Sequence, residues 1–219
     1  MQKKASAKIG SPRDRSPARQ VRIIGGRWKR THLPVLAADG LRPTPDRVRE
    51  TVFNWLTHLL DGDWHRIVCL DLFAGSGALG FEAASRGAVN VTMVEAHTPA
   101  VKQLEATRAR LGAVEVQIVR GDAMTVARTL IGNETPRFDL IFLDPPYQQG
   151  WLAKILPLCA QLLADGGIVY VEAEMGLTDQ RWPAPPMTPA DRWEIVRDGH
   201  AGVVFYQLLQ CGKTRRVEA

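Results

Sequence analysis

The sequence predicts an α/β protein with a central, mostly parallel sheet of seven strands and helices on both faces. From residue 66 onward, short apolar runs alternate with helical patterns, which is the order that builds a parallel sheet. A glycine-rich turn follows the first run, and a short polar turn joins the last two, as in an antiparallel carboxyl-terminal hairpin. With 219 residues and 45% apolar content, the chain is long enough to bury one large core.

The elements of this domain follow one another in regular order. Pro157 should kink the last helix, and Asp165-Gly166-Gly167 should form the turn that ends it. A loop with four prolines is expected over residues 178–190, before an antiparallel pair that turns at Asp198-Gly199. The pattern places strands at residues 67–70, 91–94, 114–119, 138–143, 168–171, 193–197 and 203–209, and helices at 78–86, 99–111, 123–131 and 151–164.

Two smaller segments precede this domain, which we expect to span residues 41–219. Residues 1–20 are rich in Lys, Arg, Ser and Pro, and should form a disordered basic arm. Residues 21–40 should form a β-hairpin extension, with strands at 21–24 and 27–33 on either side of a Gly25-Gly26 turn.

The domain itself should open with an amphipathic helix. Thr44 is a candidate N-cap, Pro45 suits the first helical position, and Asp46 suits the positive end of the helix dipole. Helical spacing predicts a core-facing stripe made of Val48, Val52, Trp55, Leu56, Leu59 and Leu60.

Positive charge is concentrated at the amino terminus. Residues 1–30 hold ten Lys or Arg and one acid, Asp14, so they carry +9 in a chain whose net charge is +5. A basic arm on a mildly acidic body indicates a polyanionic partner, and nucleic acid fits best. Trp28, between cations, can either stack on a base or pack against the core. The candidate nucleic-acid-binding residues are Arg22, Arg27, Trp28, Lys29, Arg30 and Arg42.

The remaining composition indicates a cytoplasmic protein, which we expect to be a monomer. The three cysteines are scattered and form no CxxC pair, which disfavours a disulfide framework or a zinc site, and we expect no metal. No apolar run approaches the ~18 residues needed to span a bilayer. The basic amino terminus has no apolar segment behind it and therefore does not resemble a secretory signal.

Acidic side chains end the first three strands of the domain. Asp71 opens the glycine-rich turn, and Glu95 and Asp122 follow the next two strands. The turn matches the GxGxxG dinucleotide fingerprint, but a carboxylate at Asp71 would repel a pyrophosphate. Three acids in register suit a ligand with an ammonium group, a ribose and an adenine, such as S-adenosylmethionine. The candidate cofactor-binding residues are Asp71, Phe73, Gly75, Gly77, Glu95, Asp122 and Ala123.

The fourth strand ends abruptly at Asp144-Pro145-Pro146-Tyr147. Because both prolines lack an N–H group, the strand cannot continue inside a sheet, and a stiff bend should form at its carboxyl edge. Ligands of open parallel sheets bind at that edge. The Asp144 carboxylate and the Pro145 carbonyl can each accept a proton of an amino group, and Tyr147 can stack on a base. These four residues are therefore the catalytic candidates.

The two motifs together resemble the class I S-adenosylmethionine-dependent methyltransferases that modify exocyclic amino groups, which implies a Rossmann-like fold. Further signatures resemble the RsmD family over about residues 21–210. They are Arg22-Ile23-Ile24-Gly25-Gly26, Leu41-Arg42-Pro43-Thr44, Asp46-Arg47-Val48-Arg49-Glu50 and Phe53-Asn54-Trp55-Leu56. The resemblance implies methylation of N2 of one guanine in bacterial 16S ribosomal RNA, with the naked RNA or the assembling 30S particle as partner.

Four alternatives remain open at this point. Adenine-N6 methyltransferases acting on DNA or RNA and protein glutamine methyltransferases share the Pro-Pro-Tyr chemistry, but more often carry Asn at the position of Asp144. An NAD-dependent oxidoreductase would fit the glycine-rich turn alone. A non-catalytic RNA-binding module would fit the basic arm, but it would have no use for the intact acids.

Overall fold

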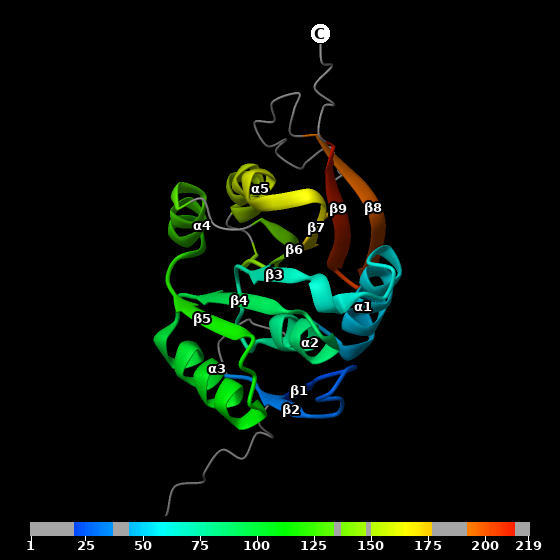
Figure 1. The fold of residues 1–219 in the computed structure, drawn as a ribbon. Coiled ribbons are helices and arrows are strands. Elements are labelled where there is room, and N and C mark those ends of the chain that lie inside the picture. Colours follow the sequence, from blue (N-terminus) through cyan, green and yellow to red (C-terminus); the bar gives the residue numbers. More distant parts are fainter. Residues whose placement is uncertain (1–19, 37–43, 134–136, 148–149, 177–191, 213–219) are drawn as a thin grey trace, which may run out of the picture.

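A computed structural model describes residues 20–36, 44–133, 137–147, 150–176 and 192–212 of the chain (Figure 1). Its centre is a seven-stranded sheet in the order β5-β4-β3-β6-β7-β9-β8. The first five of these strands pair in parallel, and β9 runs antiparallel to both of its neighbours. The strands are β3 (Val68–Asp71), β4 (Asn90–Glu95), β5 (Val116–Arg120), β6 (Phe138–Leu143), β7 (Leu163–Ala173), β8 (Arg192–Ala201) and β9 (Val204–Gly212).

Helices cover both faces of the sheet, and each face has its own apolar core (Figure 1). One core contains residues of α1 (Asp46–Leu59), α2 (Ala78–Arg86) and α3 (Thr98–Leu111). The other contains residues of α4 (Ala123–Gly132) and α5 (Trp151–Leu162). Successive residues of a strand serve opposite cores, as Leu140 and Ile141 of β6 do. The predicted sheet, with helices on both faces and an antiparallel carboxyl-terminal pair, is confirmed (Figure 1). No helix in the described ranges is long and apolar enough to cross a membrane.

The predicted stripe of α1 faces the first core. Val48, Val52 and Leu56 are fully buried, and the neighbouring Trp55 and Leu59 pack against the same core. The N-cap prediction was wrong, because α1 begins at Asp46 with Pro45 in the cap position and no side-chain cap. Thr44 is buried, and its hydroxyl donates to the Glu172 carboxylate, at 2.7 Å, instead of to the helix end.

The turn predicted at Asp198-Gly199 was also wrong. β8 continues through both residues to Ala201, and the chain reverses at Gly202, where φ is +64°. Asp-Gly is a common turn pair, but Gly199 has a different use here. A Cβ atom on Gly199 would lie 2.6 Å from the Tyr206 ring, so the glycine leaves room for a side chain of the neighbouring strand.

The end of α5 differs from the prediction as well. The helix contains Pro157 and ends at Leu162, and Leu163 already has an extended conformation. Asp165-Gly166-Gly167 therefore lies within β7, where the pairing with β6 shifts register between Phe138 and Leu140. An irregular strand start occupies the place of the expected helix-ending turn. The loop predicted over residues 178–190 lies outside the described residues.

The amino-terminal hairpin consists of β1 (Gln20–Arg22) and β2 (His32–Pro34). The second strand was predicted to begin at Arg27, but residues 27–30 form turns. The ladder is closed across the loop by the Ile23 N–H donating to Thr31 O, and the Arg30 N–H donating to Ile23 O. The arm expected to be disordered was predicted to extend to residue 20, but Gln20 already belongs to β1. Residues 1–19 and the expected boundary near residue 40 lie outside the described residues.

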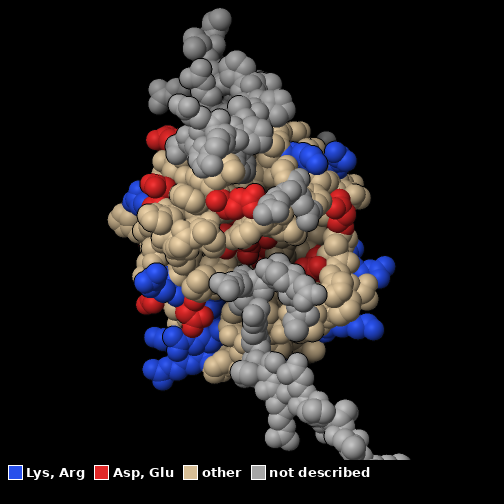
Figure 2. Space-filling model, turned by 180° about the vertical axis from the view of Figure 1, so that it is seen from behind, with Lys and Arg blue, Asp and Glu red and all other residues tan. Residues whose placement is uncertain are grey.

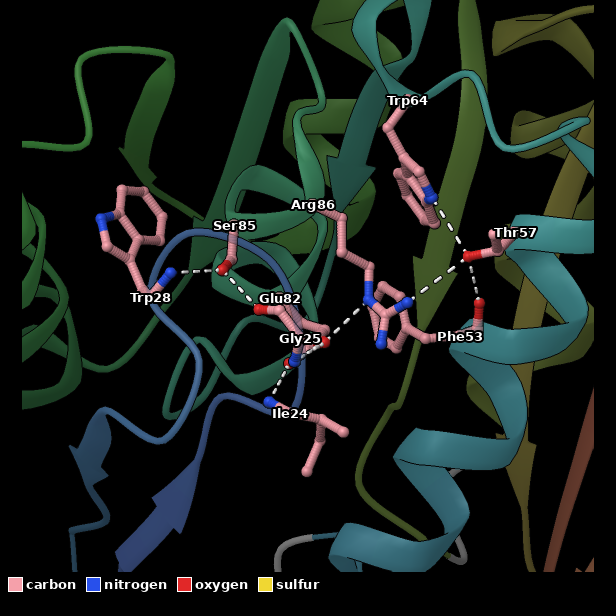
Figure 3. A network of polar contacts seen from close by, with 9 residues as sticks. All are labelled: Ile24, Gly25, Trp28, Phe53, Thr57, Trp64, Glu82, Ser85 and Arg86. Carbon is pink, nitrogen blue, oxygen red and sulfur yellow. Dashed lines mark hydrogen bonds and ion pairs between the residues drawn. The ribbon is translucent and has the colours of Figure 1, made fainter.

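The loop of the hairpin is fastened to α2 (Figure 3). The fully buried Glu82 carboxylate accepts hydrogen bonds from the Ile24 N–H at 2.6 Å and the Gly25 N–H at 2.8 Å. Ser85 Oγ accepts from the Trp28 N–H and donates to Gly25 O. The contact is so close that a Cβ atom on Gly26, where φ is +71°, would lie 1.9 Å from Ser85 O. The Gly25-Gly26 pair thus lets the hairpin loop both turn and pack closely against α2.

Candidate active site

Acidic residues meet at the carboxyl edge of the parallel strands. Asp71 ends β3, Glu95 ends β4, Asp122 follows β5, Asp144 follows β6, and Glu172 lies near the end of β7. In Figure 2, acidic side chains lie in a hollow at the centre of the face shown, and Lys and Arg side chains lie at its margin. The sequence prediction that the strand-end acids converge is correct for the backbone positions, because β3, β4, β5 and β6 are adjacent and parallel.

Asp71 shapes the glycine-rich turn from inside. It is 1% exposed, and its carboxylate accepts hydrogen bonds from the Phe73 N–H at 3.4 Å and the Gly80 N–H at 3.2 Å. Burial raises the pKa of Asp71 to about 7, assisted by the charge of Glu95 and opposed by the two backbone donors. Gly77 adopts a φ of +79°, and a Cβ atom there would lie 2.5 Å from the Phe81 ring.

Glu95 and Asp122 accept backbone hydrogen bonds at the same carboxyl edge of the sheet. Glu95 accepts hydrogen bonds from the Gly75 N–H at 2.9 Å and the His97 N–H at 2.7 Å, which ties the turn after β3 to the end of β4. Asp122 is the N-cap of α4, and its Oδ1 accepts from the Thr125 N–H at 2.9 Å. Each carboxylate has further lone pairs for a ligand, as a hydroxyl or amino group would require.

Two aromatic rings meet beside these acids. Phe73, in the glycine-rich turn, and Trp151, at the start of α5, lie edge to face with 5.6 Å between ring centroids. The sequence prediction included Phe73 but missed Trp151, which was assigned only to a helix. Its position in the sequence shortly after Asp144-Pro145-Pro146-Tyr147 was the available signal.

The donor and acceptor set fits S-adenosylmethionine. The ligand has an ammonium group, a ribose diol, an adenine amino group and a sulfonium, and carries no phosphate, so carboxylates suit its hydrogen-bond donors and its positive charges. Gly75 has a φ of +52°, and a Cβ atom there would meet only Phe73 O, at 3.9 Å, so the backbone can approach a ligand closely. The role of each residue toward the cofactor, including Ala123 on the buried first turn of α4, stays a prediction.

The bend after β6 combines a recessed acid and an outward ring. Asp144 is half-buried and Pro145 is buried, whereas Pro146 and Tyr147 are exposed, with 40% of Tyr147 accessible. Burial, followed by the charges of Glu172 and Asp71, raises the pKa of Asp144 well above its usual range. The bend thus places a half-buried acceptor close in sequence to an exposed ring, the combination expected for holding an amino group.

Glu172 is the acid that the sequence prediction missed. It is 2% exposed, and hydroxyl groups of Thr44, Tyr170 and Tyr147 donate to it. The strand predicted over residues 168–171 lies within the longer β7, and Glu172 directly follows the predicted range. The rule that found Asp71, Glu95 and Asp122, an acid at the end of a parallel strand, would have found this residue as well.

The candidate nucleic-acid-binding residues gather on the hairpin. Lys29 and Arg30 are exposed, Arg22 pairs with Asp46 at 2.6 Å, and Arg27 pairs with Glu115. Trp28 is half-buried, packs against the core and carries the Arg27 guanidinium 4.1 Å above its ring. Of the two roles considered for Trp28, packing against the core is therefore observed. Arg42 lies outside the described residues. Among the described residues, no group of three or more His, Cys, Asp or Glu side chains could hold a metal ion.

Comparison with solved structures supports the same class of protein. SMU.776, solved in complex with SAH, superimposes with a TM-score of 0.65 at 15% identity, over 81% of this chain and 53% of that one. The yhhF protein of Escherichia coli superimposes with a TM-score of 0.71 at 38% identity, over 89% of this chain and 99% of that one. Fold and site define an S-adenosylmethionine-dependent methyltransferase of class I.

The family follows from the sequence comparisons. The profile of the family described as Conserved hypothetical protein 95 matches residues 21–210. Ribosomal RNA small subunit methyltransferase D of Escherichia coli K12 is 42% identical over 87% of this chain and 90% of its own length. The protein of the same name from Haemophilus influenzae is 36% identical over 87% of this chain and 94% of its own length. The chain therefore belongs to the RsmD family, as its motifs predicted.

Proposed function

We propose that this protein transfers a methyl group from S-adenosylmethionine to N2 of a guanine in bacterial 16S ribosomal RNA. The observation that carries the proposal is the bend after β6, where a half-buried Asp144 lies beside an exposed Tyr147. The substrate class follows from the relatives, whose names specify the small ribosomal subunit. The exposed cations of the hairpin suit an RNA partner, either as naked RNA or within an assembling subunit.

The chemistry depends mainly on positioning. An exocyclic amine of guanine is a poor nucleophile, because its lone pair is delocalised into the ring. S-adenosylmethionine supplies an already activated methyl group. The protein has to localise the amine lone pair and align it, and Asp144 and the Pro145 carbonyl do this by accepting one amino proton each. A hydrogen bond to an ionised acceptor contributes about 1.5–3 kcal/mol.

The base also has to leave its stack to reach this bend. Unstacking costs a few kcal/mol, and stacking on Tyr147 returns about 1–3 kcal/mol. The proton of the amine leaves to solvent after transfer, so Asp144 has to act only as a hydrogen-bond acceptor.

The test is a comparison of 16S ribosomal RNA from a strain that lacks the gene with RNA from the parent strain. Mass mapping should find one guanine N2 methyl group missing, and purified protein with S-adenosylmethionine should restore it on that RNA. Digestion to nucleosides separates N2-methylguanosine from N6-methyladenosine. A restored N6-methyladenosine, or no difference between the strains, would refute the proposal.

A further inference from the structure

Glu172 is held by hydroxyl groups from three separate parts of the chain. Its Oε2 accepts hydrogen bonds from Thr44 Oγ1 at 2.7 Å and from the Tyr170 hydroxyl at 2.9 Å. Its Oε1 accepts from the Tyr147 hydroxyl at 3.3 Å. Thr44 precedes α1, Tyr170 and Glu172 belong to β7, and Tyr147 follows β6. One carboxylate therefore connects the catalytic bend to the start of the domain.

This arrangement is costly for an acid. Glu172 is 2% exposed, and no Lys or Arg of the described part of the chain forms an ion pair with it or with Asp144. A buried carboxylate without a cation loses its hydration, and neutral hydroxyl groups offset only part of that loss. Acids in such surroundings are concentrated at functional sites, where position matters more than stability.

The exposed ring of Tyr147 has few other constraints. It follows two prolines, and 40% of it is accessible. Among the described residues, its hydroxyl group forms a hydrogen bond with Glu172 alone, and this bond fixes the far end of the side chain. A ring that is held at both ends loses less rotational entropy when a base stacks on it.

We propose that Glu172 is a positioning residue, which holds the Tyr147 ring in the orientation that receives the target base. Glu172 does not touch the reacting atoms and acts through the Tyr147 hydroxyl group. Thr44 and Tyr170 fix the carboxylate itself, so that its remaining oxygen faces Tyr147. The inference rests on the proposed function for its catalytic consequence, but the contact between the two side chains can be measured independently.

The charge of Glu172 adds a second effect that a purely structural residue would lack. The groups that face Asp144 are Glu172 and Tyr170 on β7, Asp71 on β3, and Tyr147 in its own bend. Of the two carboxylates, Glu172 contributes more than Asp71 to the raised pKa of Asp144. Replacing Glu172 by Gln removes that charge, so the pH at which Asp144 ionises should fall.

The test is a double-mutant cycle with Tyr147→Phe and Glu172→Leu, assayed by kcat/KM for the RNA substrate. Each single variant should lose about tenfold, the equivalent of one hydrogen bond. The double variant should lose no more than Glu172→Leu alone, because that variant has already removed the hydrogen bond that Tyr147→Phe removes. Losses that multiply to about a hundredfold would mean that Glu172 does not act through Tyr147, and would overturn the proposal.

Two further measurements separate positioning from general damage. Asp139→Leu is the matched control, because this strand acid accepts a backbone bond from Val68 at 2.9 Å at the opposite edge of the sheet. It should change kcat/KM for the RNA substrate less than twofold. Glu172→Gln should move the acid limb of the kcat profile to lower pH, and an unmoved limb would overturn the proposal. All variants should bind S-adenosylmethionine as the wild type does, by calorimetry.

The same cycle in thermal unfolding keeps this inference distinct from the proposed function. If the wild-type protein does not methylate guanine N2, the proposed function fails, whatever the variants do. The coupling between Tyr147→Phe and Glu172→Leu in unfolding free energy still reports their interaction. Additive effects on unfolding would overturn the interaction itself, and non-additive effects would support it.

Discussion

At the scale of single residues, the candidate site is a group of acids whose burial disfavours their charged forms. Asp71, Asp144 and Glu172 are all raised in pKa, and burial is the first cause for each of them. Their negative charges repel one another, and Glu172 and Asp71 therefore both raise the pKa of Asp144. The proposed mechanism needs Asp144 as an acceptor, whereas folding favours its neutral form.

The first prediction concerns Asp144→Ala. Methyl transfer should fall by at least a hundredfold, because the variant loses the acceptor that localises the amine lone pair. The affinity for S-adenosylmethionine, measured by calorimetry, should change less than threefold, since the predicted cofactor acids are other residues. Substantial methyl transfer by this variant would remove Asp144 from the mechanism.

The second prediction concerns stability and pH. The folded-state pKa of Asp144 is raised, so its contribution to stability is complete below the ordinary carboxyl range and is lost as pH rises through the folded value. Asp144→Asn cannot ionise and should therefore unfold at a higher temperature than the wild type at pH 8. A gain of about 1 kcal/mol would raise the melting temperature by ~2–4 °C. The gain should shrink on acidification to pH 4, and a gain that is independent of pH would contradict this account.

At the scale of elements, the sequence predicted what local pattern and strand order determine. The helix over 78–86 and the strand over 138–143 have the predicted bounds, because turn glycines and prolines mark their ends. Thr44 was misassigned because its partner, Glu172, is 128 residues away, and capping rules consider only neighbours. The same limit explains Gly199, whose reason for being glycine is the Tyr206 ring on the adjacent strand.

The third prediction tests why the hairpin loop carries a glycine pair. Gly26→Ala should destabilise the protein by more than the roughly 1–2 kcal/mol of a left-handed alanine, because its Cβ atom would also collide with Ser85 O. Gly62→Ala is the matched control, with a φ of +74° and nothing within 4 Å of the added atom. Urea unfolding compares the two variants, and equal losses would mean that close docking on α2 is not what requires the glycine.

At the scale of the whole molecule, acidic and basic side chains occupy two separate regions. The strand-end acids occupy one edge of the sheet, and the exposed cations Arg22, Arg27, Lys29 and Arg30 belong to the hairpin. Glu82 fastens that hairpin to α2, which follows the glycine-rich turn. A surface of exposed cations is thus attached directly to the helix that follows the glycine-rich turn. If that surface binds RNA phosphates as we propose, RNA affinity comes from the hairpin while the acidic site selects an amine.

The last prediction concerns residues 1–20, which contribute six cations, Lys3, Lys4, Lys8, Arg13, Arg15 and Arg19, against Asp14. If this arm binds RNA phosphates, its deletion should weaken RNA binding and flatten the dependence of log K on log salt, because fewer counterions are released. The slope should fall by about 0.7–0.9 for each phosphate that the protein no longer neutralises. Replacing the six cations by Gln in the full-length chain is the matched control, and it should reproduce the deletion, since charge and not chain length carries the effect. Titrations of labelled 16S RNA fragments at low and high salt would measure both variants. An unchanged slope would mean that RNA affinity comes from the docked hairpin alone.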